Sequence, residues 1–138
     1  MASERPFHLM IAEDDPEMRS LLGRALRRDT YQVTLAPDAH SLLRALDQLD
    51  ALSSGPDLIV SDVRMPGATG LDLVRLLRAR GLPIPIVLVS AFASAELYRA
   101  ATDAGASYLM SKPFDMDDLR TVVMNLLVSR RGHSAPLL

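Results

Sequence analysis

Four apolar stretches of this sequence each end in side chains that could bind or transfer a charged group. In chain order these side chains are Glu13, Asp14 and Asp15, then Asp62, then Ser90, then Lys112. Carboxylates that lie together repel one another, and a bound divalent cation relieves that repulsion. Because the expected ligands are all oxygen atoms, a hard ion is indicated, Mg²⁺ before Ca²⁺ or Mn²⁺.

Asp62 is the member of this set that could react. An aspartate carboxylate can act as a nucleophile and carry a phosphoryl group as an aspartyl-phosphate. Ser90 could donate a hydrogen bond to that group, and Lys112 could balance its charge. Lys112 is a single lysine beside 14 arginines. Since a compact ammonium binds phosphate as a point charge and arginine presents a planar fork, the lysine fits this role. The pattern therefore predicts Mg²⁺-dependent phosphoryl transfer to Asp62.

Each of these residues also has an ordinary structural interpretation. An acid after a strand often caps the next helix, so Asp15, next to Pro16, is either such a cap or a member of the acidic cluster. Capping does not explain Asp62, because the next expected helix begins several residues later, near Gly70. A serine or a lysine alone would be unremarkable at a surface. The combination of all of them at strand ends favours a functional site.

The elements that must position these side chains alternate along the chain. Strand-like apolar runs cover residues 7–12, 31–36, 58–61, 86–90 and 107–111, and an amphipathic, helix-like stretch follows each of them. This alternation predicts an α/β fold: a doubly wound, five-stranded parallel sheet of order 2-1-3-4-5, flavodoxin-like, with helices on both faces. In that order the polar strand ends meet at one edge of the sheet, with Asp62 at the centre.

Length and composition argue against several other classes of protein. The 138 residues fit one domain with a single core, and the net charge of −2 gives no electrostatic case for binding nucleic acid or an anionic membrane. The first ten residues lack the apolar core of a signal peptide, and no apolar run approaches the roughly 20 residues that cross a bilayer. The absence of cysteine fits a reducing compartment. We expect a cytoplasmic domain over residues 1–128, with residues 129–138 as a flexible tail or the start of a linker.

The sequence resembles the receiver domain of two-component response regulators, the CheY-like family, from about Phe7 to Val128. The resemblance rests on four motifs: AEDD after the first strand, SDVRMPG after the third, VSA after the fourth and SKPF after the fifth. It implies that Asp62 is the phosphoacceptor and that Ser90 and Lys112 assist it. The implied metal ligands are Asp14, Asp62, Glu13 through a water molecule, and the backbone carbonyl of Arg64. The resemblance also implies a cis bond between Lys112 and Pro113.

The function implied by the resemblance is a phosphorylatable signalling switch. A sensor histidine kinase or a phosphotransfer protein would supply the phosphoryl group, and the domain would catalyse its own phosphorylation and dephosphorylation without being a dedicated enzyme. Phosphorylation would alter the surface formed by residues 94–105, residues 107–111 and the last helix. That surface would control a downstream protein, a fused effector domain or a homodimer, and this domain itself would bind neither nucleic acid nor membrane. Relatives usually have an aromatic switch residue where this chain has Leu109.

Two other functions fit parts of the pattern. One is a pseudo-receiver, a protein-interaction module whose output ignores phosphorylation, but that would require losses at the site, and none is found. The other is a metal-dependent phosphohydrolase with an aspartyl nucleophile. Such an enzyme needs a second acid close after the nucleophile, and here Val63 and Arg64 follow Asp62.

Overall fold

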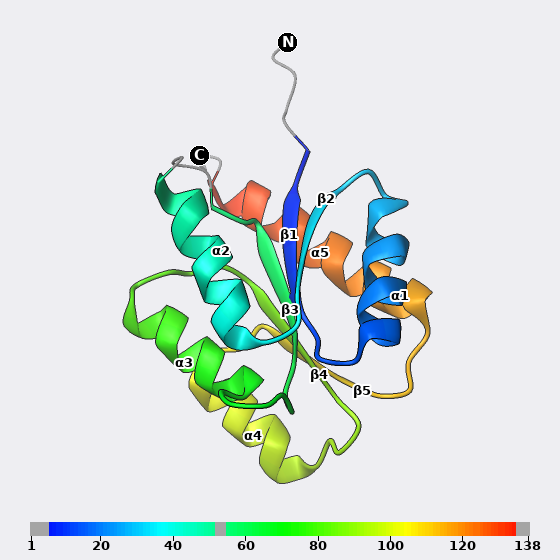
Figure 1. Cartoon of the computed structure of the whole chain (residues 1–138), viewed down its shortest axis with the longest axis vertical. Helices are drawn as coiled ribbons and strands as arrows, with labels where there is room; N and C mark the ends of the chain where they lie inside the picture. The colour runs from blue at the N-terminus through cyan, green and yellow to red at the C-terminus, as the bar shows by residue number, and fades with distance from the viewer. Residues whose placement is uncertain (1–5, 52–54, 135–138) are drawn as a thin grey trace.

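Five parallel strands alternate with five helices in the computed structural model, which describes residues 6–51 and 55–134 (Figure 1). The strands are β1 (His8–Ala12), β2 (Gln32–Ala36), β3 (Leu58–Asp62), β4 (Ile86–Ser90) and β5 (Tyr108–Ser111). The helices are α1 (Pro16–Arg27), α2 (Ala39–Ala51), α3 (Gly70–Ala79), α4 (Ala95–Ala104) and α5 (Met116–Ser134). The strand order is β2-β1-β3-β4-β5, which confirms the predicted doubly wound sheet.

The sheet is covered on both faces, so its central strands β3 and β4 are buried along their whole length and are apolar up to their polar carboxyl ends. Because side chains alternate along a strand, Met10 and Ile59 face one core, which also contains residues of α2, α3 and α4. Ile11 and Val60 face the opposite core, built with α1 and α5. In Figure 1 the two groups of helices lie on opposite sides of the sheet.

The loops that follow β1 and β3 at the carboxyl edge of the sheet each end at a capped helix N-terminus. Asp15 caps α1, since its side chain accepts a hydrogen bond from the amide of Glu17 at 3.2 Å. This contact favours the capping interpretation of Asp15. At α3, Thr69 and Asp72 form a reciprocal capping box. Both loops therefore leave the sheet along fixed paths.

The strand register brings the polar ends of four strands to one edge. Asp62 on β3 pairs with Val89 on β4, and Ser90 pairs with Ser111 on β5. Residues that follow these strands, including Glu13 and Lys112, therefore emerge side by side. This edge is where doubly wound sheets bind ligands.

Helix α5 is longer than the sequence pattern predicts. It continues through Ser134, past Val128, where we placed the end of the domain. Arg130 donates a hydrogen bond from Nη1 to the carbonyl of Asp57 at 2.9 Å, so the first part of the expected tail is helical and is attached to the domain. Residues 135–138 of that tail lie outside the described residues. Among the helices of the described ranges, none is long and apolar enough to cross a membrane.

Candidate functional site

Three carboxylates meet at the carboxyl edge of the sheet, as the sequence predicts. Glu13 and Asp14 follow β1, Asp62 ends β3, and one oxygen of each lies within 4.8 Å of the others. Glu13 is 1 % exposed and Asp62 is 7 % exposed, whereas Asp14 is open to solvent. Asp15 caps α1 and is not a member of this group. Buried carboxylates at such short range need cations beside them.

Lys112 supplies one such cation. Its Nζ donates to Glu13 Oε1 at 3.1 Å and to Asp62 Oδ2 at 3.2 Å. Burial alone would lower the pKa of the Lys112 ammonium, but the hydrogen bonds and charges of the two carboxylates outweigh it and raise the pKa. Burial raises the pKa of Glu13, although hydrogen bonds from the Asp15 amide and from Lys112 oppose that shift. A single ammonium does not balance three carboxylates, so the group fits a divalent cation.

The backbone around Asp62 is held on two sides. The amide of Val63 donates to the carbonyl of Val89 at 2.9 Å, which extends the pairing of β3 and β4 past Asp62. On the other side, Gly70 packs so closely that a Cβ atom there would lie 2.5 Å from the Asp62 carbonyl oxygen. Glycine at the start of α3 therefore allows the helix to approach the strand end.

Ser90 and Arg64 lie at the rim of the same edge. Ser90 is buried, and its Oγ accepts a hydrogen bond from the amide of Phe92 at 3.0 Å. The amide of Arg64 lies 3.4 Å from Asp62 Oδ1. Lys112 is joined to the end of β4 by a hydrogen bond from its amide to the Ser90 carbonyl at 2.7 Å. The Lys112–Pro113 peptide bond is cis, as the resemblance implies.

Three further residues of the site were not predicted from the sequence. Arg19 on α1 donates from Nη1 to the carbonyl of Glu13 at 2.9 Å and so supports the loop that carries the acidic pair. Gly70 permits the close approach of α3, and its position at an expected helix start was the available signal. Phe92 stacks on Arg64. Nothing in the sequence pairs those two residues, although each lies two positions after a site residue.

Comparison with known proteins agrees with this geometry. Residues 9–124 match the family described as "Response regulator receiver domain". The chain is 36% identical over 122 residues to response regulator MprA of Mycolicibacterium vanbaalenii, covering 88% of this chain and 51% of that protein. It is 35% identical over 116 residues to transcriptional regulatory protein FixJ of Bradyrhizobium diazoefficiens, covering 84% of this chain and 54% of that protein. The chain thus spans about half the length of these relatives.

Solved structures share the fold. A putative response regulator from Chloroflexus aurantiacus is 30% identical, with a TM-score of 0.78 over 90% of this chain and 99% of that one. A CheY-like receiver domain protein from Methanospirillum hungatei superposes with a TM-score of 0.84 over 94% and 100% of the two chains, and at 21% identity it supports the fold alone. The predicted resemblance is confirmed, and this chain belongs to the family of response regulator receiver domains.

Proposed function

We propose that this chain is a signalling switch that accepts a phosphoryl group on Asp62 from a phosphohistidine of a sensor histidine kinase or a phosphotransfer protein. The observation that carries the proposal is the nearly buried Asp62 carboxylate, held between the Lys112 ammonium and the acidic pair after β1. The domain catalyses this transfer and the later hydrolysis on itself, without being a dedicated enzyme. We place it in the cytoplasm, where such kinases present their phosphohistidine.

The transfer uses the residues in distinct roles. A carboxylate oxygen of Asp62 attacks phosphorus, the phosphorus–nitrogen bond of phosphohistidine breaks, and its electron pair returns to the imidazole. Lys112 pairs with Asp62 Oδ2 before the reaction and can follow the charge onto a phosphoryl oxygen afterwards. The Ser90 hydroxyl, at the end of the neighbouring strand, donates a hydrogen bond to the same group. Proton exchange at the imidazole takes place with solvent.

The donor set at the edge fits Mg²⁺, because it consists of carboxylate oxygens in excess of the local positive charge. Asp14 and Asp62 would bind the ion directly, Glu13 through water, and Arg64 through its backbone carbonyl. When bound, the ion supplies positive charge to the phosphoryl oxygens. Lys112 pairs with Glu13 and Asp62, and the amides of Asp15 and Arg64 donate to the same two carboxylates.

Intact-mass measurements with acetyl phosphate and Mg²⁺ test this proposal. The wild-type chain should gain one phosphoryl group that is labile at alkaline pH, and Asp62→Asn should gain none. Asp14→Ala should raise the Mg²⁺ concentration needed for half-maximal phosphorylation by roughly tenfold or more, because one direct ligand is lost. An Asp62→Asn protein that still gains a group with the same lability, or an unchanged Mg²⁺ dependence in Asp14→Ala, would refute the assignment.

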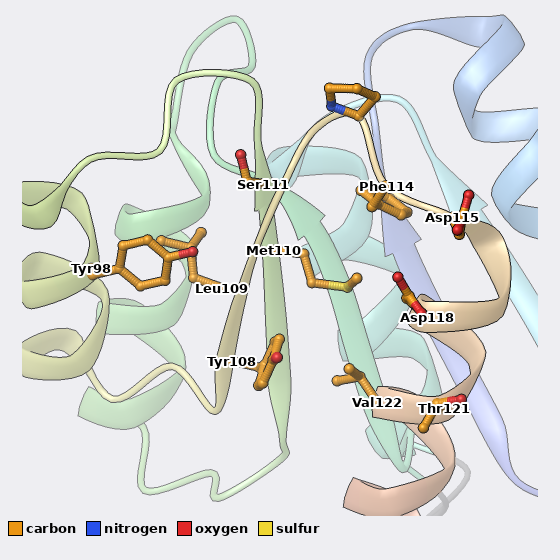
Figure 2. Close-up of a pocket in the computed structure, with 11 residues that line it drawn as sticks. Tyr98, Tyr108, Leu109, Met110, Ser111, Phe114, Asp115, Asp118, Thr121 and Val122 are labelled. Atoms are coloured by element: carbon orange, nitrogen blue, oxygen red, sulfur yellow. The ribbon is translucent and has the colours of Figure 1, made fainter.

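We further propose that phosphorylation is read at the surface formed by α4, β5 and α5. A groove on this surface is lined by Tyr98, Tyr108, Leu109, Met110, Ser111, Pro113, Phe114, Asp115, Asp118, Thr121 and Val122, most of which are labelled in Figure 2. Tyr108 is 48 % exposed and Leu109 is 7 % exposed, so the two face opposite ways. Lys112 follows β5 directly and connects this groove to the phosphorylation site. The occupant would be a downstream protein, a fused effector domain or a second copy of the chain.

Amide exchange with and without beryllofluoride, which mimics an aspartyl-phosphate, tests the location of this surface. Changes in protection should concentrate between residues 90 and 119, and changes confined to α1 and α2 would refute it. Leucine at position 109 is smaller than an aromatic ring, so Leu109→Tyr should enlarge the response. An unchanged response would show that the switch does not depend on the side chain at this position.

A further inference from the structure

Arg78, near the end of α3, joins two loops at the edge of the sheet opposite to Asp62. Its Nε and Nη2 atoms donate to the carbonyl of Gly105 at 3.1 and 2.9 Å, and its Nη1 atom donates to the carbonyl of Leu82 at 2.7 Å. Gly105 is the left-handed C-cap of α4, with φ 102°, and Leu82 lies in the loop between α3 and β4. One side chain therefore connects α3, the end of α4 and the chain that enters β4.

The guanidinium of Arg78 has no counter-ion within residues 6–51 and 55–134. Its three hydrogen bonds all end on carbonyl oxygens, and no carboxylate contributes to its pKa. Burial lowers the pKa of this guanidinium, and the positive charge of Arg130 acts in the same direction. Burying a cation without an anionic partner is unfavourable. The compensation comes from carbonyls, one of them at the negative end of α4, so the charge serves to attach the end of that helix.

Helix α4 is packed unevenly along its length. Ala101, in its second half, is the one buried residue of this fully described helix, and its carbonyl accepts hydrogen bonds from the amides of Gly105 and Ala106 at 3.2 and 2.9 Å. At the other end, Ser94 accepts a hydrogen bond from the amide of Leu97 at 3.1 Å, which is a contact within the first turn. That turn is exposed apart from the half-buried Leu97. The C-terminal end of α4 is thus the end that is fixed to the domain.

We propose that Arg78 is a positioning residue that fixes the C-terminal end of α4, so that the response of this helix to phosphorylation is confined to its N-terminal half. This inference rests on the proposed function and deepens it. The N-terminal end of α4 follows Ser90 by a short loop, so a change at Asp62 reaches the helix from that end. With its other end fixed, α4 can tilt but cannot slide along α3, which lies beside it (Figure 1).

The consequence concerns the groove between α4, β5 and α5. Tyr98 lies in the N-terminal half of α4 and Tyr108 begins β5, and both line this groove (Figure 2). A tilt about the fixed end moves Tyr98 relative to Tyr108. Because the chain from Gly105 into β5 stays in place, Tyr108 keeps its pairing with Val87 of β4. The groove therefore changes shape without a shift in the register of the sheet.

Amide exchange of the full chain, without any phosphate analogue, tests the attachment itself. Arg78→Met keeps the apolar stem and removes all three donors. A hydrogen bond to a charged group changes an equilibrium constant by about ten- to hundredfold, so exchange at Gly105 and Ala106 should rise by at least about tenfold. Arg80→Met is the matched control, because Arg80 lies at the same end of α3 but pairs with Asp47 of α2 at 3.1 Å. It should leave both amides at the wild-type rate.

A second variant separates the geometry of the contact from its charge. Arg78→Lys keeps the charge, but an ammonium cannot reproduce a planar guanidinium that reaches two carbonyls. Exchange at Gly105 and Ala106 should therefore rise by about three- to tenfold, and this variant decides the question should Arg78→Met not fold. The amides of α1 report a general loss of stability, and an equal rise there would count against a local role of Arg78.

Beryllofluoride tests the confinement of the response. In wild type and in Arg80→Met, changes of protection within α4 should fall on residues 95–100 and leave residues 101–107 unchanged. In Arg78→Met they should extend through residues 101–107. A wild-type chain that does not respond to beryllofluoride would count against the proposed function, and exchange without the analogue would then decide whether Arg78 fixes the end of α4. Wild-type exchange of Gly105 and Ala106 in either Arg78 variant, or wild-type changes that run through residues 101–107, would overturn the inference.

Discussion

Replacing Gly70 with alanine should disturb the proposed phosphorylation site through the backbone alone. Gly70 begins α3, and a Cβ atom there would lie 2.5 Å from the carbonyl oxygen of Asp62 and 3.1 Å from Cα of Val63. Both are backbone atoms, so no side-chain rotation can relieve the overlap. Ordinary contact starts at about 3.4 Å, so α3 or the end of β3 must move by about 0.9 Å.

The loss of stability in Gly70→Ala follows from two opposing contributions. Overpacking in a closely packed region costs about 1–3 kcal/mol. Alanine also lowers the entropy of the unfolded chain, which returns about 0.4–1 kcal/mol. We therefore expect a net loss of up to about 2.5 kcal/mol in the free energy of unfolding. A displacement near 1 Å can cost about 100-fold in rate, so phosphorylation of Asp62 should slow by at least about tenfold.

Chemical denaturation and the rate of phosphorylation by acetyl phosphate measure the two effects. Gly81→Ala is the matched control: Gly81 has φ +76°, but no atom lies within 4 Å of its added Cβ. The left-handed conformation costs alanine about 1–2 kcal/mol, and the same entropy contribution of about 0.4–1 kcal/mol opposes it, so both variants should lose some stability. Only Gly70→Ala should lose phosphorylation rate. Equal rates in both variants would refute the argument that close packing of α3 positions Asp62.

Two further predictions concern charged side chains. Lys112→Arg should still be phosphorylated but should not give the wild-type pattern of amide protection with beryllofluoride. The reason is that a planar guanidinium cannot take the place of the ammonium between Glu13 and Asp62. Identical protection patterns in the two proteins would contradict this prediction. Arg120 binds Asp29 through two hydrogen bonds, at 2.9 and 2.7 Å, and this lowers the pKa of the Asp29 carboxyl. The stability that Asp29 contributes should be complete above its unfolded pKa of about 3.9 and should be lost as pH falls through the lower folded value. Urea denaturation of wild type and Asp29→Asn should therefore converge with falling pH, and a constant difference down to pH 2 would contradict this prediction.

The sequence by itself determined the alternation of strands and helices and the position of the polar side chains at strand ends. Apolar runs such as residues 86–90 are bounded by turns and helical patterns, and parallel strands all end at the same edge. The grouping of Glu13, Asp14 and Asp62 near Lys112 could therefore be predicted without coordinates. Alternation along a strand also predicts that Leu109 and Tyr108 face opposite ways, and the structure shows that Leu109 is the buried one of the two.

Tertiary structure alone decided the contacts between loops and the extent of the last helix. The Arg64–Phe92 stack joins residues 28 positions apart in chain order (92 − 64), and no local pattern specifies which loop side chains will meet. The steric overlap that a Cβ atom at position 70 would cause depends on how closely α3 approaches β3. That distance is set by packing and not by helix propensity. Helix α5 runs past Val128, and Arg130 in this extension donates a hydrogen bond to the carbonyl of Asp57, at the end of β3 opposite to Asp62. Long-range contacts of this kind are made only once the sheet has assembled, so the sequence pattern around each residue does not contain them.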